Sequence, residues 1–500
     1  MQKNSRLADW IRQQARNVPN RRCFVTEQGA TTFAEVNARV NRVAGGLARF
    51  GVRTGDRVAL FATDSPEYIE TLLACAKLGA VFVPLNPRLA LPELQTLLRT
   101  AEAKVLFYSE RYADLVHALD VPGLTAIVDY GAGYAELLAH DNDDEADVEV
   151  SDDDTVCLAF TSGTTATPKA VVHSQRFAKH LSIHSILSLR LPGTAFHYSA
   201  APQFHIAGMH LVLGGIALGY PSLILAAFDP ATAARWMSTG GLDRVFLVPT
   251  MIDSLLQHGA GDFSRIRHIV YGGSPMSPAL LRRAMDTFGC DFTNAFGAGT
   301  EAGTQTVLTP EDHRLALAGQ EHLLGSIGKP APGVDLKLCD DEWNEVPDGD
   351  IGEIVTRSDA VMDGYLGQPE ATNDVLRDGW FRSGDLAYRD RDGYLYLSGR
   401  TKDMIIRGGE NIYPIEIETV LAAHPSVREA AVVGVADEHW GEIVRAHVVL
   451  EPGAAFDERS VQDFCRQRLA TFKVPTLFAT HSELPRNAAG KVLKRELRSR

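Results

Sequence analysis

Runs of apolar residues rich in β-branched and aromatic side chains alternate with longer helix-like stretches through most of the chain. The first such runs are RVALFA (57–62), VFVPLN (81–86) and KVLFYS (104–109), and helix-like segments separate them. This alternation is typical of βαβ units, whose parallel strands are buried on both faces by helices. We therefore predict a large α/β domain with more than one sheet. Five later runs continue the pattern: DTVCLAFTS (154–162), TAFHYSA (194–200), SLILAAF (222–228), DRVFLVPT (243–250) and RHIVYGGS (267–274).

The sequence changes its character twice towards the C-terminus. After Ile327, short β-rich segments with turn signals such as Asp378-Gly379 predict a β-rich subdomain. Beyond Arg400, helix-like and strand-like segments alternate again. With 500 residues available, we expect an α/β protein whose large multi-sheet N-terminal domain, residues 1–400, includes this subdomain. A small α+β C-terminal domain follows over residues 401–500.

Composition and charge narrow the classes of function. Hydrophobic residues at 45% and charged residues at 22% are ordinary for globular proteins, so disorder and coiled coil have no support. The formal net charge of −14 comes with no basic face, so we expect no nucleic-acid partner. The six cysteines are scattered without a CxxC pair, which indicates a reducing compartment, and we expect a cytoplasmic location.

Two segments require a check for membrane targeting. The N-terminus lacks the apolar stretch of a secretory signal. Residues 206–228 contain no Asp, Glu, Lys or Arg, but Gly219, Tyr220 and Pro221 interrupt them. We therefore expect a buried helix and a short strand here, and no membrane span.

One segment is suited to holding phosphates. Residues 160–170 read FTSGTTATPKA, after a predicted strand and before the helix-like HSQRFAKHL (173–181). Small hydroxyl residues and glycine let backbone N–H and side-chain O–H groups surround a polyanion, and Lys169 adds a positive charge. The segment does not match the ordinary P-loop, since its lysine follows a proline. A flexible Ser/Thr-rich turn is the structural alternative.

Four further motifs combine glycine turns with charged side chains. Each alone is weak, because an Asp in a turn is usually a cap and a Lys near a C-terminus is usually solvated. Their occurrence together and in this order is specific. They are NAFGAGTE (294–301), GWFRSGD (379–385), GRTKDMIIRGGENIYP (399–414) and PRNAAGK (485–491).

With these five motifs, the chain resembles the adenylate-forming superfamily of acyl-CoA synthetases, peptide-synthetase adenylation domains and luciferases over essentially its whole length. NPRL (86–89), PQFHIAG (202–208) and KVLKREL (491–497) are most similar to bacterial aryl- and acyl-CoA ligases. The resemblance implies an ATP- and Mg²⁺-dependent ligase for an aromatic or medium-sized apolar acid. The carboxylate attacks the α-phosphate of ATP, giving an acyl-adenylate and pyrophosphate, and CoA as co-substrate then displaces AMP.

The resemblance also implies roles for individual residues in adenylation. Lys491 matches the lysine that stabilises negative charge developing between carboxylate and phosphate. Thr300 would contact phosphate and Glu301 would help to hold Mg²⁺. Asp385 would accept hydrogen bonds from the ribose hydroxyls, and Arg400 would add a donor. The ATP-binding set is Thr161, Ser162, Gly163, Thr164, Thr165, Lys169, Gly297, Asp385 and Arg400.

Two further sets concern the acyl group and CoA. The acyl-pocket candidates are Phe204, His205, Met251, Gly272, Gly273 and Gly303, which together suggest an apolar slot for a flat ring. His205 has a catalytic role at the pocket mouth in this interpretation, and a buried structural histidine is the alternative. By resemblance, the C-terminal domain is mobile and rotates about Lys402, bringing Gly408 and Gly409 to the thiol tunnel. Trp440 and Arg88 match positions that meet the CoA nucleotide.

The chain departs from the family pattern at three places, which keeps other acceptors open. Ala166 and Ala170 replace glycines of the phosphate loop, and one extra residue before Thr300 predicts a displaced loop. Residues 472–476, FKVPT, lack the added basic residues of some aryl-CoA ligases. An amine acceptor, giving an amide, and loading of a carrier protein in trans are the alternatives.

Two other classes are less well supported by the residues. GGSPM (272–276) lacks the last glycine of the hydrolase motif G-x-S-x-G. A pseudoenzyme that binds nucleotide without turnover is disfavoured because every charged motif residue is present. The identity of the acid and the oligomeric state stay open.

Overall fold

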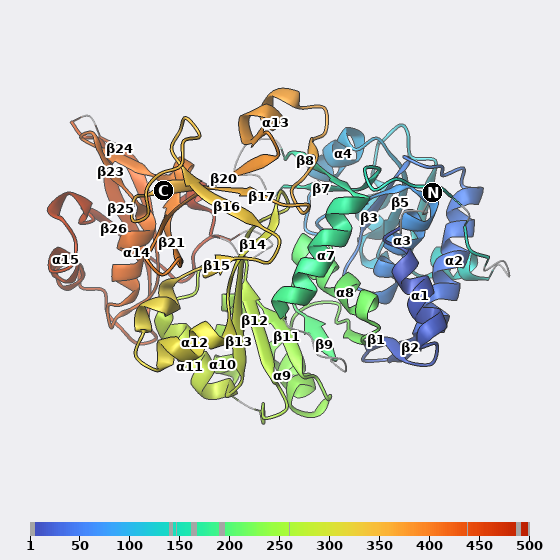
Figure 1. The fold of residues 1–500 in the computed structure, drawn as a ribbon, viewed down its shortest axis with the longest axis horizontal. Helices are drawn as coiled ribbons and strands as arrows, with labels where there is room; N and C mark the ends of the chain where they lie inside the picture. Colours follow the sequence, from blue (N-terminus) through green and yellow to red (C-terminus); the bar gives the residue numbers. More distant parts are fainter. Residues whose placement is uncertain are drawn as a thin grey trace.

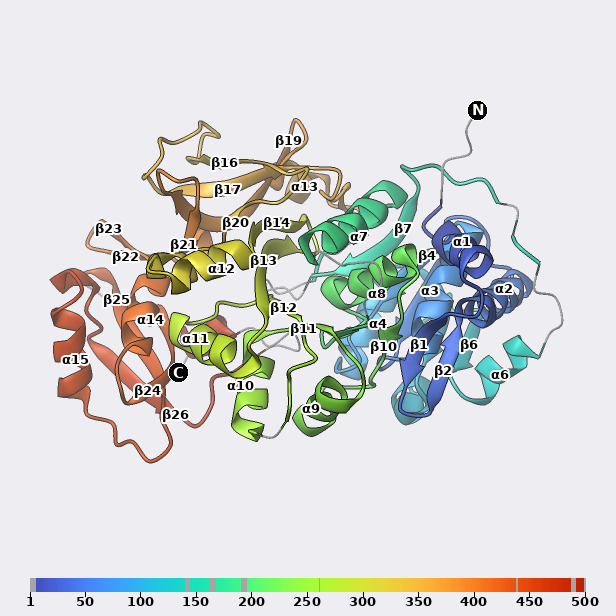
Figure 2. The ribbon, with the colours of Figure 1, turned by 60° about the horizontal axis from the view of Figure 1, so that its bottom comes forward.

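The strands described by the computed structural model form four sheets (Figure 1), and the larger sheets belong to the N-terminal part, as the sequence predicts. The C-terminal sheet lies at the opposite end of the molecule from α1 (Asp9–Asn17) and α2 (Phe33–Arg49) (Figures 1 and 2). The predicted α/β class, with a smaller C-terminal part, is confirmed. The structure describes residues 6–139, 144–146, 148–161, 168–189, 196–259, 261–437, 439–486 and 492–498.

A seven-stranded sheet is parallel in its middle and antiparallel at one edge. Its order is β18-β8-β7-β4-β3-β5-β6, and the two strands at the β18 edge run antiparallel to their neighbours. Helical crossovers account for the parallel strands, as predicted, but β7 and β8 form a hairpin. The strands are β3 (Arg57–Phe61), β4 (Val81–Pro84), β5 (Ala103–Tyr108), β6 (Ala126–Asp129), β7 (Thr155–Phe160), β8 (Ala170–Ser174) and β18 (Gly364–Tyr365).

A nine-stranded sheet has the order β15-β14-β13-β12-β11-β9-β10-β1-β2 and is antiparallel at both edges. The predicted strand over 222–228 is much shorter, because only Ser222 and Leu223 pair with their neighbours. Its strands are β1 (Arg22–Thr26), β2 (Gly29–Thr32), β9 (His197–Ser199), β10 (Ser222–Leu223), β11 (Arg244–Leu247), β12 (His268–Gly272), β13 (Asp291–Gly299), β14 (Gly303–Leu308) and β15 (Lys329–Pro330).

Helices cover both faces of these two sheets. One core joins the facing sides of the two sheets through α1, α2, α3, α6, α7 and α8. The outer face of the seven-stranded sheet packs on α4 and α5, and that of the nine-stranded sheet packs on α9 to α12. The helices are α3 (Pro66–Leu78), α4 (Leu91–Thr100), α5 (Ala113–His117), α6 (Ala132–Leu138), α7 (Gln175–Leu189), α8 (Ile206–Leu218), α9 (Pro230–Thr239), α10 (Pro249–His258), α11 (Pro278–Phe288) and α12 (Pro310–Leu317).

Helix α3 shows why this part of the chain forms an inner layer. Ser65 caps its N-terminus by accepting a hydrogen bond from the Tyr68 backbone N–H at 3.2 Å, and Pro66 occupies the first turn. Gly79 ends it in the left-handed conformation, with φ of 66°. The residues from Tyr68 to Leu78 are all buried. Each large apolar side chain contributes roughly 1.5–3 kcal/mol on burial, so the helix is stable only between the sheets.

The predicted helix and short strand within residues 206–228 are present as α8 and β10. Among the described residues, no helix has both the length and the apolar character needed to cross a membrane.

A third sheet, of residues 335–400, matches the predicted β-rich subdomain. Its order is β16-β17-β20-β19, with β21 paired to β20, and in Figure 2 it lies along the top of the molecule. Asp378 and Gly379 have φ of 52° and 77° and turn the chain between β19 and β20. The elements are β16 (Asp335–Cys339), β17 (Gly352–Arg357), α13 (Pro369–Val375), β19 (Leu376–Arg377), β20 (Trp380–Arg389) and β21 (Leu395–Arg400).

The fourth sheet has the order β23-β22-β25-β24, with β26 paired to β25. Helices α14 and α15 pack on one face, and α16 shares the smaller cluster on the other. The elements are β22 (Ile405–Arg407), β23 (Glu410–Ile412), α14 (Pro414–Ala422), β24 (Val427–Asp437), β25 (Gly441–Leu450), α15 (Glu458–Arg466), β26 (Leu477–His481) and α16 (Lys494–Arg498).

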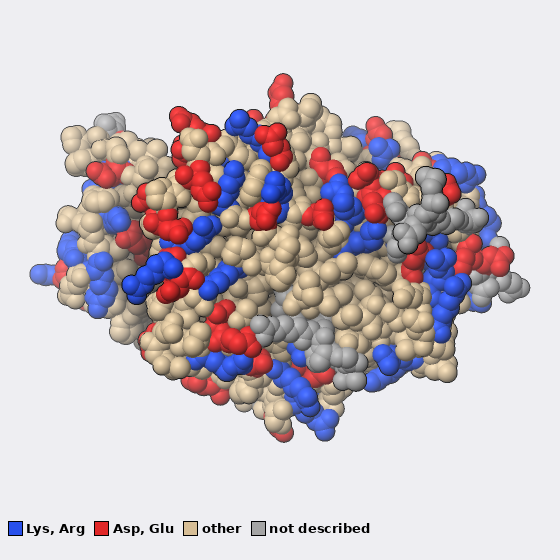
Figure 3. Space-filling view, viewed as in Figure 1, with Lys and Arg blue, Asp and Glu red and all other residues tan. Residues whose placement is uncertain are grey.

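Charged side chains are mixed in sign on the face shown in Figure 3. Lys and Arg lie among Asp and Glu around its edge, and the middle is mostly uncharged. This face therefore offers no continuous basic surface of the kind that a phosphate backbone requires.

Candidate active site

The ends of the phosphate-loop segment are joined by two hydrogen bonds. The Thr161 backbone N–H donates to the Lys169 carbonyl at 2.9 Å, and the Lys169 N–H donates to Thr161 Oγ1 at 3.2 Å. Ser162, Gly163, Thr164 and Thr165 lie outside the described residues, as does Ala166. The segment therefore connects the two antiparallel strands β7 and β8. The helix expected over HSQRFAKHL (173–181) is present as α7, which begins at Gln175, and the AVVHS segment before it forms β8 and pairs with β7.

Tyr365 links the loop lysine to the predicted metal ligand. Lys169 Nζ lies 4.4 Å from the centre of the Tyr365 ring, a cation–π contact. The Tyr365 hydroxyl donates to Glu301 Oε1 at 3.4 Å. Tyr365 lies in β18, which pairs with β8 just beyond the loop. Lys169 and Glu301, far apart in the sequence, thus both contact one aromatic residue, the first at its ring face and the second at its hydroxyl.

Burial raises the pKa of the Glu301 carboxyl above its ordinary range. The positive charges of Arg400 and Lys169 and the Tyr365 hydroxyl act in the opposite direction. The Glu301 backbone is fixed by Met362, whose N–H donates to the Glu301 carbonyl at 2.7 Å. A divalent ion that arrives with phosphates would stabilise the charged form of this desolvated carboxylate. The described residues contain no cluster of three acidic, His or Cys ligands, and Mg²⁺ held mainly by substrate phosphates needs only one or two carboxylates.

Thr300 and its neighbours form the turn between β13 and β14. His173 Nε2 donates to the Thr300 carbonyl at 2.7 Å, and burial lowers the pKa of His173 to about 4, so the ring is neutral at pH 7. The strand register shifts between Phe296 and Gly297 and again between Gly297 and Gly299. At the first shift the additional residue is Gln305 on β14, and at the second it is Ala298 on β13, so the segment before Thr300 contains a β-bulge at Ala298. Gly297 lies between the two shifts, paired with Thr304.

Asp385 and Arg400 form a cross-strand ion pair beside a cavity. Arg400 Nε lies 2.7 Å from Asp385 Oδ1, and the Asp385 side chain is buried. The two residues face each other on β20 and β21. Ser383, Gly384, Thr401 and Lys402 join Arg400 around a cavity of about 250 Å³. An acceptor carboxylate and a guanidinium donor thus adjoin an opening large enough for part of a small ligand.

The site lies where three sheets meet. Val171 of β8, Ala302 of the β13–β14 turn and Phe381 of β20 belong to one small apolar cluster with Tyr365. Lys169 comes from the seven-stranded sheet, Glu301 from the nine-stranded sheet, and Arg400 from the third sheet. Each charged residue therefore depends on a different sheet for its position.

The predicted acyl-pocket residues fall into two groups. Phe204 packs on the core between the sheets, and His205 begins α8, its Nδ1 accepting from the Ala207 N–H at 3.3 Å. Burial lowers the pKa of His205. A Cβ at Gly272 would lie 2.2 Å from the Ala295 carbonyl oxygen, so any side chain there would displace β13.

The other three residues do not share one face of the nine-stranded sheet. Gly273 follows β12 and lies near Val248, and Gly303 begins β14 against Leu181 of α7. Met251 of α10 packs on the core at the outer face of the nine-stranded sheet, away from the cluster that contains Val248 and Ala295.

Asp64 is a half-buried acid that sequence reasoning missed. It lies between β3 and α3, and its Oδ1 accepts from the Gln203 backbone N–H at 2.8 Å. Gln203 Oε1 accepts in turn from the Ser65 N–H at 2.9 Å. These bonds fix the segment that leads to His205. Burial raises the pKa of Asp64 to about 7.

Replacing Asp64 by asparagine is expected to change the pH dependence of stability. Because the folded pKa of about 7 lies above the ordinary 3.8, the folded state favours the protonated acid. The stabilisation that the protonated Asp64 gives the folded state is complete below pH 3.8 and is lost as the pH rises through 7. Between pH 5 and 8 the wild type should lose roughly 1–4 kcal/mol of unfolding free energy relative to Asp64→Asn. Denaturant unfolding of both proteins at these pH values measures it, and parallel pH profiles would contradict the assignment.

The C-terminal candidates lie around one hairpin. Gly408 and Gly409, with φ of 59° and 89°, form the turn between β22 and β23. The Gly408 N–H donates to the Trp440 carbonyl at 2.8 Å, and Arg407 lies 5.2 Å from the Trp440 ring centre. Trp440 is 45% exposed. The structure therefore brings these glycines and Trp440 together at a surface.

The remaining candidates lie elsewhere. Arg88 lies between β4 and α4, and its N–H donates to Asn86 Oδ1 at 3.0 Å. Lys402 lies in the short segment between β21 and β22, and desolvation followed by the charge of Arg400 lowers its pKa. Lys491 lies outside the described residues, next to Val492, which forms a bridge with Arg486.

Tyr365 and His173 are further residues that the sequence did not single out. A tyrosine in a two-residue strand and a histidine in an apolar strand carry no local signal of function. Their roles follow from contacts with Glu301 and Thr300 across sheets.

Comparison with known proteins adds independent evidence. The model of the AMP-binding enzyme family matches residues 11–366, and that of the AMP-binding enzyme C-terminal domain matches residues 416–491. A feruloyl-CoA synthase from Amycolatopsis is 38% identical over 502 residues, covering 100% of this chain and 99% of the relative.

Two other relatives use different acceptors by name. A fatty acid–[acyl-carrier-protein] ligase, ScoC, from Streptomyces coeruleorubidus is 36% identical, covering 97% of this chain and 94% of the relative. The structure of the amide bond synthetase McbA from Marinactinospora thermotolerans superposes with a TM-score of 0.90 at 30% identity, covering 99% of both chains. The resemblance stated from the motifs is confirmed: this chain belongs to the AMP-binding enzyme family.

Proposed function

We propose that the chain is an AMP-forming acid–CoA ligase that activates an aromatic or medium-sized apolar carboxylic acid with ATP and transfers the acyl group to CoA. The observation that carries the proposal is the meeting of Lys169, Glu301, Asp385 and Arg400 where three sheets join, beside a cavity of about 250 Å³. Two cations and two acids in one place suit a polyphosphate that carries a ribose.

Each residue has a proposed role that follows from its surroundings. Lys169 neutralises phosphate charge, and its two hydrogen bonds with Thr161 fix its backbone. Asp385, oriented by Arg400, accepts hydrogen bonds from the ribose hydroxyls. Glu301 helps to hold Mg²⁺, which when bound offsets charge on the leaving pyrophosphate. Thr300 is fixed by His173 at the phosphate side of the site.

The C-terminal part supplies the remaining groups. We place the domain boundary at residues 400 and 401, with Lys402 as the hinge. Lys491 stabilises charge as the acid attacks the α-phosphate. Gly408 and Gly409 line the approach of the thiol, because backbone without Cβ lets a narrow chain pass closely. Trp440, exposed next to this turn, and Arg88 meet the CoA nucleotide.

CoA is the favoured acceptor, and an amine is the second candidate. The feruloyl-CoA synthase matches the whole chain at 38% identity, and the glycine turn with its exposed tryptophan suits a nucleotide-bearing thiol. The amine acceptor is supported by the structural match with an amide bond synthetase, at a TM-score of 0.90. Carrier-protein loading is the third outcome, as in the relative ScoC. Six free cysteines support a reducing, cytoplasmic location.

Mass spectrometry of products distinguishes these acceptors. The enzyme is incubated with ATP, Mg²⁺ and a panel of benzoic, cinnamic and C6–C12 fatty acids, in parallel with CoA, with simple amines and with neither. We expect an acyl-CoA together with AMP and pyrophosphate, and an acyl-adenylate when no acceptor is added. Amide formation without acyl-CoA would replace the acceptor, and the absence of any acyl-adenylate would refute the proposal. A reaction without ATP is the control.

A further inference from the structure

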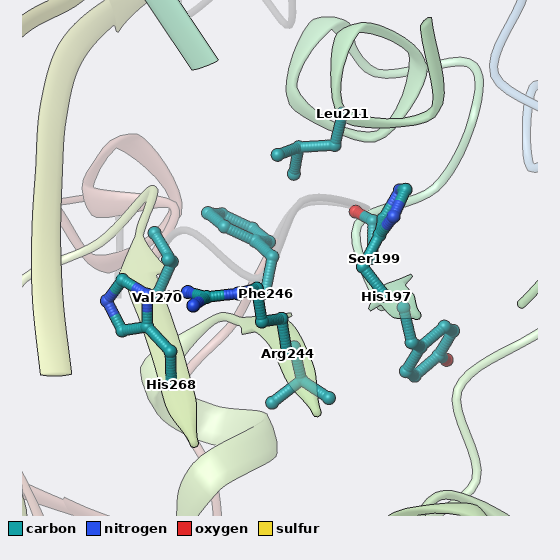
Figure 4. A pocket seen from close by; sticks show the side chains of 9 residues that line it. His197, Ser199, Leu211, Arg244, Phe246, His268 and Val270 are labelled. Atoms are coloured by element: carbon teal, nitrogen blue, oxygen red, sulfur yellow. Dashed lines mark hydrogen bonds between the residues drawn. The ribbon is translucent and has the colours of Figure 1, made fainter. Parts of the chain in front are cut away.

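A small buried cavity of about 10 Å³ lies between α8 and the strands β9, β11 and β12 (Figure 4). Leu211 reaches towards it from α8, and the other labelled residues come from the strands. This volume holds about one water-sized group. The lining comprises His197, Tyr198, Ser199, Leu211, Arg244, Val245, Phe246, His268 and Val270.

The strand register arranges six of the lining residues in two rows on the face of the sheet towards α8, whereas Tyr198 and Val245 alternate to the other face. One row is Ser199, Phe246 and Val270, and the other is His197, Arg244 and His268. Gly272 follows Val270 by two residues on β12, so it lies on the same face, nearer the strand ends. The Ser199 row is therefore roughly 7 Å from Gly272 along the strands, comparable with the span of one substituted aromatic ring.

A path of packed apolar side chains joins this cavity to the proposed acyl pocket. Leu211, Phe246 and Val270 belong to one cluster with Ala207, Val248 and Ala295. Ala207 donates its N–H to His205, and Ala295 lies against Gly272. Ala207 and Leu211 are one helical turn apart on α8, so they face the same side. The side chains that line the cavity thus contact, through Ala207 and Ala295, the residues proposed to hold the acid.

The far end of this path is polar. Ser199 Oγ is buried and has no hydrogen-bond partner among the described residues. His197 is 4% exposed, and its Nε2 is paired with Ser222 Oγ at 3.1 Å. Arg244 Nη1 lies 2.6 Å from His268 Nδ1, and His268 Nε2 lies 2.7 Å from Thr293 Oγ1. Buried hydroxyls are normally satisfied, so Ser199 Oγ requires an explanation.

We infer that this cavity is the distal end of the acyl pocket, where Ser199 hydrogen-bonds a hydroxyl substituent at the far end of the acid. The inference rests on the proposed function and names its substrate class: hydroxylated aromatic acids in preference to their unsubstituted counterparts. A hydroxyl fits a water-sized space, whereas a carboxylate or a long alkyl end does not. A site built to bond a hydroxyl rejects an analogue without one, because its polar groups are then left unpaired.

Paired acids test the inference through pyrophosphate release. The kcat/KM ratio of 4-hydroxycinnamate to cinnamate, and of 4-hydroxybenzoate to benzoate, is measured for wild type, Ser199→Ala and Ser238→Ala. Ser238 is the matched control, since its Oγ donates to the Ala234 carbonyl within α9, on the other side of the sheet. We expect a wild-type ratio above about 10 for the better-used pair, reduced about tenfold by Ser199→Ala and unchanged by Ser238→Ala.

Two results would overturn the inference while leaving the proposed function intact. One is a wild-type ratio near or below one, and the other is a ratio insensitive to Ser199→Ala. In the first case, a lower melting temperature of Ser199→Ala would show that the cavity holds an internal water only. Failure to adenylate any acid would instead refute the proposed function, so the two failures are distinguishable.

Discussion

Lys491→Ala is expected to reduce acyl-adenylate formation by about 10²–10³-fold, the usual loss when a group that stabilises transition-state charge is removed. Transfer to CoA from a supplied acyl-adenylate should fall far less, because the phosphate chemistry is already complete. The variant should therefore affect the two half-reactions to very different extents. Pyrophosphate release measures the first, and acyl-CoA formation from synthetic acyl-adenylate measures the second.

Lys494→Ala is the matched control for this experiment. It removes the same charge three residues away, where Lys494 Nζ is paired with Glu418 Oε1 at 2.6 Å. Both half-reactions of this variant should stay near the wild-type rates. Equal loss of both half-reactions in Lys491→Ala would exclude a role confined to adenylation, and full adenylation activity would remove Lys491 from the site.

Asp385→Ala is expected to raise the KM for ATP by about 10–100-fold, the equivalent of losing a charged hydrogen bond of about 1.5–3 kcal/mol. Asp385 is 5% exposed, and its carboxylate is oriented by Arg400 Nε at 2.7 Å, beside the cavity. Its loss removes the acceptor proposed for the ribose and leaves the guanidinium free to reorient. The KM for the acid should change much less.

A second ion pair in the same sheet provides the control. Arg357 and Asp335 pair across β16 and β17 at 2.8 Å, in exposed positions away from the cavity. Asp335→Ala should leave the KM for ATP within about twofold of the wild-type value, since exposed pairs contribute little. If Asp385→Ala left the KM for ATP unchanged, Asp385 would not belong to the nucleotide site. Steady-state kinetics with each substrate varied in turn measures both constants.

The predictions about acceptor and substrate depend on different parts of the chain. The proposed binding of CoA involves the Gly408–Gly409 turn and Trp440, whereas the inferred preference for a hydroxylated acid involves Ser199 between α8 and the nine-stranded sheet. A result in one experiment therefore does not decide the other. Both require adenylation, which the Lys491 and Asp385 variants examine directly.

Sequence reasoning was accurate where the signal is local. The runs at 57–62, 81–86 and 104–109 predicted strands that the structure contains as β3, β4 and β5. The Gly219–Pro221 break correctly separated α8 from β10. The helix predicted from HSQRFAKHL is present as α7, whereas the sequence did not predict the short strand that AVVHS forms before it. Pairing with β7, which is a long-range interaction, decides the outcome.

The sequence by itself determined the family, the α/β class and the five motifs, because hydrophobic period, turn residues and motif order are all read within short windows. The tertiary structure decided which of these residues meet. Tyr365 between Lys169 and Glu301, the Asp385–Arg400 pair and the buried Ser199 hydroxyl all depend on contacts between strands or sheets. Such contacts are fixed by the packing of whole sheets against shared helices, which no short window of sequence contains.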